Sequence, residues 1–199
     1  MIGDVVVVAP EPAPWVEPMM AALGDRGRLI APWARLDSPW SWLPQRFQAA
    51  WRRRQRPGAQ TLPGFGGVEL LERAMSLSPA GAIRARLIRR RAVDRWAVRH
   101  VGGARVVIAP TLGARRSFAA ARRSGATVVL MADLPQLRGL HADLDSAARQ
   151  HPTLDFLRNH RASPGLVARQ EAERVLADHI LVRGEHARGL WGPAAHVVA

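Results

Sequence analysis

The sequence lacks three residue types that carry much of protein chemistry. Its 199 residues include no cysteine, no tyrosine and no lysine, so all 29 basic residues are arginine. The absence of cysteine excludes disulfides, thiolate nucleophiles and cysteine-ligated metal sites. The absence of lysine beside abundant alanine, glycine and proline indicates codon usage that favours arginine, which accounts for part of the net charge of +13. The remaining charge favours anionic partners such as phosphate groups, acidic lipids or nucleic acid.

The sequence also lacks an apolar run long enough to cross a bilayer. The run from Val5 to Ala9 is too short for a signal peptide or a membrane span, and no cationic segment precedes it. Hydrophobic residues make up 48% of the chain, which is enough to build a buried core. We therefore expect a soluble, cytoplasmic protein.

Short β-branched runs alternate with helical segments along the chain. Continuous apolar strands between helices are typical of a parallel sheet with right-handed crossovers. We therefore predict an α/β, Rossmann-like fold with a mostly parallel sheet and helices on both faces. Strands are predicted at 5–9, 29–31, 105–109, 127–131 and 179–182, helices at 15–23, 80–100, 114–123, 163–176 and 185–191, and loops with short helices up to residue 162.

Residues 37–100 interrupt this alternation and are predicted to form a basic helical insertion within a single domain spanning 1–199. Tryptophan and arginine alternate between Trp40 and Arg56, and a predicted helix carries arginines between Arg84 and Arg91. Tryptophan beside arginine suits an anionic membrane surface, so peripheral binding at the inner face of the membrane is one interpretation. A solvated basic face over core tryptophans is the other. The two segments hold nine of the 29 arginines: Arg52, Arg53, Arg54, Arg56, Arg84, Arg86, Arg89, Arg90 and Arg91.

The second half carries a recognisable order of segments. A strand at 106–109 leads through a loop at 110–113 to a helix at 117–123, and the next strand ends in Asp133-Leu134-Pro135. The segments 140–145 and His151-Pro152 follow, and an acid-rich helix at 169–174 leads through Ala177-Asp178 to the strand at 179–182. Residues 100–192 thereby resemble the N-terminal domain of family 4 glycosyltransferases, which have two Rossmann-like domains. Residues 1–35 match only as a generic Rossmann opening, with prolines at 10–14 where the family often has glycines.

The resemblance implies a division of labour. In such enzymes the N-terminal domain binds the acceptor and the C-terminal domain binds the nucleotide sugar; the reaction typically retains anomeric configuration and needs no metal. It implies a hexosyltransferase with a nucleotide-sugar donor, a glycan or lipid-linked acceptor, no cofactor and no nucleic-acid partner, acting in cell-envelope or exopolysaccharide synthesis. The donor domain is expected to be absent, since residues 197–199 fall where the linker would begin. The alternatives are a non-catalytic accessory subunit of a two-chain glycosyltransferase and a basic nucleic-acid-binding protein.

Candidate site residues come from the resemblance and from the rule that ligands of open parallel sheets bind beyond the carboxyl ends of the strands. Asp133 follows a predicted strand and could bind an acceptor hydroxyl or orient a base, with a turn cap as the alternative. His141 lies in a predicted loop nearby, and the resemblance implies a role for it, since family members often place a histidine in the loops that face the cleft. It could donate to the acceptor or to a donor phosphate, with a surface histidine as the alternative. These two are the predicted catalytic groups. Acceptor or phosphate binding is predicted at Arg138, Pro10, Glu11, Thr111 and Gly113.

Two other groups of charged residues are predicted to carry no chemistry. The spacing of His141, Asp143, Asp145 and His151 matches no strong metal-ligand motif, so we predict no metal site. In the acid-rich helix, arginine and glutamate stand four and three residues apart, which predicts ordinary surface ion pairs. The predicted pairs are Arg169 with Glu173 and Glu171 with Arg174.

Overall fold

Six parallel strands form the centre of the structure, a computed structural model that describes residues 4–11, 13–31, 75, 78–155, 161–192 and 195–198. The strands lie in the order β2-β1-β3-β4-β5-β6, and each neighbouring pair is parallel. The predicted α/β, Rossmann-like parallel sheet is therefore confirmed. The strands are β1 (Val5–Val8), β2 (Gly27–Ile30), β3 (Val106–Pro110), β4 (Thr127–Ala132), β5 (His179–Arg183) and β6 (Ala195–Val198).

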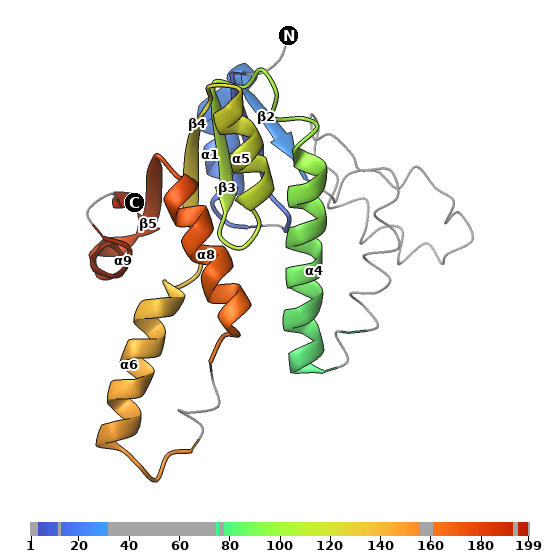
Figure 1. Cartoon of the computed structure of the whole chain (residues 1–199). Helices are drawn as coiled ribbons and strands as arrows, with labels where there is room; N and C mark the ends of the chain where they lie inside the picture. Colours follow the sequence, from blue (N-terminus) through green and yellow to red (C-terminus); the bar gives the residue numbers. More distant parts are fainter. Residues whose placement is uncertain are drawn as a thin grey trace, which may run out of the picture.

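Helices cover both faces of the sheet (Figure 1). One face packs against α1, which a short 3-10 helix, η1, follows. The other face packs against α4, α5, α8 and α9, while α6 extends away from the sheet. Their bounds are α1 (Val16–Leu23), η1 (Gly24–Arg26), α4 (Pro79–Ala97), α5 (Arg115–Arg123), α6 (Leu137–Gln150), α8 (Pro164–Leu176) and α9 (Gly184–Trp191).

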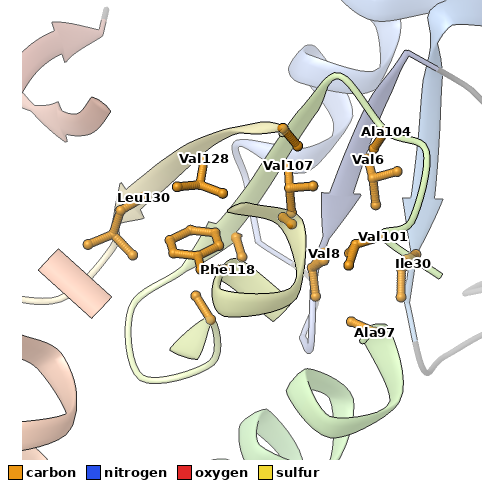
Figure 2. Close-up of a cluster of buried hydrophobic side chains, with 14 of the residues drawn as sticks. Val6, Val8, Ile30, Ala97, Val101, Ala104, Val107, Phe118, Val128 and Leu130 are labelled. Atoms are coloured by element: carbon orange, nitrogen blue, oxygen red, sulfur yellow. The ribbon is translucent and has the colours of Figure 1, made fainter. Parts of the chain in front are cut away.

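The continuous apolar character of the strands follows from burial on both faces. Val6 and Val8 point into the core beneath α4 and α5, where Phe118 is fully buried (Figure 2). Val7, between them, points the other way and joins the core beneath α1. Each strand position thus meets a helix layer, as parallel sheets require.

Local signals determine where several helices begin and end. Ser78 caps α4 by accepting a hydrogen bond from the Gly81 amide at 3.1 Å, with Pro79 in the first turn, as predicted. Ser163 makes no such side-chain bond, although α8 does begin at Pro164. Gly125 follows α5 with a φ of 79°, a conformation that glycine adopts without strain.

The chain reverses its direction of travel across the sheet once. The connection through α1 takes β1 outward to β2, whereas the connection through α4 brings the chain back across β1 to β3. The topological switch point therefore lies between β1 and β3, where the crevice of an open α/β sheet forms.

Two expectations differ from the structure, and a third lies largely outside the described residues. The stretch predicted as loops and short helices contains the 14-residue helix α6, and the residues expected to begin a linker contribute to strand β6, paired with β5. Of the insertion predicted at 37–100, only its second part lies within the described residues, as α4; the tryptophan and arginine segment lies outside them. Among the described helices, none combines the length and the apolar character that a membrane span requires.

Candidate functional site

A buried arginine from α4 lies at the switch point and joins the ends of three strands. The Arg90 guanidinium contacts Glu11, which follows β1, through Nε at 2.8 Å and also through Nη2. It donates from Nη2 to Asp133 Oδ2, after β4, at 2.7 Å, and from Nη1 to the carbonyl of Thr111, after β3, at 2.5 Å. We call these four residues the strand-end cluster.

Thr111 links the ends of β3 and β4 within this cluster. Its hydroxyl donates to Asp133 Oδ1 at 2.5 Å, and its amide donates to the same oxygen at 3.2 Å. Asp133 therefore receives bonds from a side chain, a backbone amide and a guanidinium, which orient its carboxylate.

The strand-end cluster places its cation inside and its anions outside. The Arg90 side chain is 8% exposed, whereas those of Glu11 and Asp133 are 23% and 18% exposed. With both carboxylates ionised, the two negative charges exceed the single positive one. Burial works to lower the pKa of Arg90, and the combined attraction of Asp133 and Glu11 outweighs burial, so this pKa lies above its usual range. The guanidinium is a permanent charge, and the exposed edge of the cluster offers hydrogen-bond acceptors.

A second group of charges holds the loop between β3 and α5. Glu173 of α8 is fully buried and accepts hydrogen bonds from the amides of Leu112, Ala114 at 3.0 Å and Arg115 at 3.2 Å. The Ala114 and Arg115 amides are among those that a helix N-terminus leaves without intrahelical partners, and the Leu112 amide belongs to the loop before the helix. A carboxylate from another helix therefore provides what Ala114, the N-cap residue, cannot.

Asp94 of α4 completes the cap of α5. It accepts from the Arg116 amide at 3.1 Å, and from the Ser117 amide and hydroxyl, both at 2.9 Å. Arg169 bridges the two acids, donating to Asp94 at 2.9 Å and to Glu173 at 3.2 Å. We call Asp94, Arg169 and Glu173 the cap cluster; its carboxylates are at most 1% exposed and its arginine is 14% exposed.

The loop held by the cap cluster contains a strained residue. Leu112, next to Thr111, has a φ of 62°, and no other non-glycine residue in the described ranges has a positive φ. Such a conformation costs a branched residue about 1–2 kcal/mol. The bond from the Leu112 amide to Glu173 helps to offset that cost.

Burial also changes the acidity of Glu173. Burial raises its pKa to about 6, against the opposing effects of the Ala114 amide, Arg169 and the Leu112 amide. Glu173 was predicted to form a surface pair with Arg169. The pair exists, but the surface location is wrong, because α8 turns this position toward the β3–α5 loop.

The predicted site residues divide into two sets. Glu11, Thr111 and Asp133 lie in the strand-end cluster, and Gly113 packs against it, since a Cβ at Gly113 would lie 3.4 Å from Arg90 Cβ. Pro10 is buried in the loop after β1 and has no described polar contact.

His141 and Arg138 lie elsewhere. His141 is in α6 and not in a loop, and its Nε2 accepts from the Ala162 amide at 3.0 Å. Arg138 is exposed near the start of the same helix. Neither shares a contact with the strand-end cluster.

Sequence reasoning missed the role of Arg90, although α4 carried a signal. Counting by helical turns, Arg90 shares a face with the core residues Val93 and Ala97. Asp94 is the single acidic residue in this arginine-rich helix, which also distinguishes it. Glu173 has no comparable signal, because its partners are backbone amides from about 60 residues earlier.

Within the described ranges, no three histidine, aspartate or glutamate side chains gather closely enough to hold a metal ion. No protein family, curated protein or solved structure compared with this chain matches it. The strand-end cluster must therefore be interpreted from its own chemistry.

Proposed function

We propose that this chain is the acceptor-binding, N-terminal domain of a glycosyltransferase. The observation that supports this proposal is the strand-end cluster: Glu11 and Asp133 present partly exposed carboxylates at the topological switch point. Carboxylates held in place by other bonds are strong acceptors for the hydroxyl groups of a sugar.

The charges of the described residues at this edge favour a hydroxyl ligand over a phosphate. The strand-end cluster carries a net negative charge when ionised, which repels anions. The N-terminus of α5 is the usual place for a phosphate beyond β3, and Glu173 and Asp94 already take its amides. The first turn of α1, beyond β1, carries the acidic Glu17.

Each residue of the cluster has a distinct role in this proposal. Asp133 and Glu11 accept hydrogen bonds from acceptor hydroxyls and so orient the attacking oxygen. Arg90 holds the two carboxylates at a fixed separation and offsets their mutual repulsion. Thr111 fixes the rotation of the Asp133 carboxylate. The nucleotide-sugar donor is bound by a second Rossmann-like domain, in this polypeptide or in a partner.

Ligand binding by the whole chain tests this function. In saturation-transfer NMR, we expect neutral disaccharides such as maltose to bind, and UDP-glucose to bind no better than maltose. Asp133→Asn should weaken saccharide binding about tenfold, because a hydrogen bond to a charged acceptor contributes about 1.5–3 kcal/mol. His141→Ala should leave binding unchanged, since its Nε2 is engaged with Ala162.

Besides a lack of saccharide binding by the wild type, two outcomes would contradict the proposal. One is saccharide binding that Asp133→Asn does not weaken. The other is binding of UDP-glucose or of DNA, at near-physiological salt, in preference to every saccharide tested. Preferential DNA binding at this salt concentration would favour the nucleic-acid alternative, and its absence would argue against that alternative.

A further inference from the structure

We propose that Gln170 and Glu173 of α8 are positioning residues that set the geometry of the strand-end cluster without touching the ligand. The assignment of a ligand to that cluster rests on the proposed function. The positioning itself depends only on contacts within the chain.

Glu173 determines the path of the loop that carries Thr111. It accepts from the Leu112 amide immediately after Thr111, and from the Ala114 amide at 3.0 Å. The strained φ of Leu112 lies between these two points. If the Glu173 bonds were lost, Leu112 could relax toward a negative φ, and the peptide that joins it to Thr111 would rotate.

Gln170 determines the path of the loop that follows Asp133. Its Nε2 donates to the Pro135 carbonyl at 2.9 Å, and its Oε1 accepts from the Leu137 amide at 2.6 Å. Gln170 is 1% exposed, so both bonds are protected from water. The chain is therefore fixed two residues after Asp133.

One face of α8 thus controls two neighbouring strand ends. Gln170 and Glu173 stand three residues apart and project from the same side of the helix. Gln170 fixes the loop after β4, and Glu173 fixes the loop after β3. Thr111 and Asp133, joined by two hydrogen bonds, lie on these two loops. A shift of either loop would change the Thr111–Asp133 geometry and, through it, the Arg90 contacts.

The test is an amide and guanidinium NMR measurement on the full chain, which needs no ligand. In Glu173→Gln, one oxygen acceptor becomes an NH₂ donor facing backbone amides, so we expect the Thr111 amide and the Arg90 Nε–H signals to shift. Their hydrogen exchange should accelerate about tenfold, equivalent to about 1.4 kcal/mol of lost protection. Gln170→Leu should move the Asp133 amide signal in the same way.

Arg174→Gln is the matched control. Arg174 lies on the same helix, its side chain is 43% exposed, and it pairs with Glu171. It should leave the Thr111, Asp133 and Arg90 signals in place. If Glu173→Gln fails to fold, Gln170→Leu carries the test, because it removes no charge.

A purely stabilising role gives a different result. In that case, Glu173→Gln and Gln170→Leu lower the unfolding temperature while the signals of the strand-end cluster stay unmoved, and the proposal is overturned. Saccharide binding measured on the same samples separates the two proposals. If the wild type binds no saccharide, the proposed function is wrong, while the NMR result on positioning still stands.

Discussion

Two clusters in this structure contain the same types of charged side chain in opposite arrangements. The strand-end cluster contains two carboxylates and one arginine, and so does the cap cluster. In the strand-end cluster the arginine is the most buried member and the carboxylates reach the surface. In the cap cluster the carboxylates are buried against backbone amides, and the arginine lies nearest to solvent.

The difference separates a group that holds the fold from a group that can meet a ligand. Fully buried carboxylates that accept bonds from backbone amides are out of reach of another molecule. Partly exposed carboxylates attached to a buried cation retain accessible lone pairs. Because its arginine is buried and its carboxylates are partly exposed, the strand-end cluster is the better candidate for binding a ligand.

The largest expected effect on stability comes from removing the Glu173 carboxylate from the cap cluster. Glu173→Ala leaves three backbone amides and Arg169 without their acceptor, so we expect a loss of about 3–5 kcal/mol in the free energy of unfolding. Urea denaturation at neutral pH measures this. Glu185→Ala, which removes an exposed pair with Arg188, should change stability by less than about 0.5 kcal/mol. Equal losses of unfolding free energy in the two variants would show that the buried cap cluster stabilises the fold no more than an exposed ion pair does.

Removing the cation of the strand-end cluster should have a smaller effect. Arg90→Met keeps the apolar stem but leaves Glu11 and Asp133 unneutralised, and their partial exposure lets water solvate them. We expect a loss of about 2–3 kcal/mol by the same measurement. Adding Glu11→Gln should recover part of it, because one uncompensated charge is removed. No recovery in the double variant would show that the arginine acts through packing alone.

The smallest expected effect is a pH dependence of the free energy of unfolding. The folded-state pKa of Glu173, about 6, lies above its ordinary value of 4.5, so the folded chain binds this proton more tightly than the unfolded chain does. Stability from this group is therefore greatest below pH 4.5 and falls as pH rises through 6, by about 2 kcal/mol. The difference in unfolding free energy between wild type and Glu173→Gln should show this slope between pH 4.5 and 7. A flat difference would mean that the Glu173 pKa is not raised.

The sheet could be predicted because its signals are local. The run from Val5 to Val8 and its counterparts at β3 and β4 are almost continuously apolar, with Thr127 at the start of β4 as the exception, and such runs are typical of strands buried on both faces. Strand β6 was missed because its four residues form a short run with a histidine in it. The helix α6 was missed because its N-cap is Gln136, which is not one of the usual capping residues, and because its first amide bonds a distant side chain, Gln170.

The candidate site was predictable only in part, for a related reason. The rule that ligands bind at strand ends identifies Glu11, Thr111 and Asp133 from the sequence alone. It could not identify Arg90 among 29 arginines, because its burial depends on how α4 docks on the sheet. The same rule misplaced His141, since the loop on which it was expected is a helix.

The contacts that build this edge of the sheet join residues far apart in the chain. Arg90 and Glu11 are 79 residues apart, Asp94 and Arg169 are 75 apart, and Glu173 and Leu112 are 61 apart. Closing loops of this length costs entropy that local pairing does not. Strand β1 pairs with β3 across a similar separation, so the core requires equally distant contacts. The helix α8 follows β1, β3 and β4 in the chain, so during synthesis these strands are made before the helix that fixes the loops after β3 and β4. A newly made chain should therefore have these strands before the geometry of the candidate site is complete.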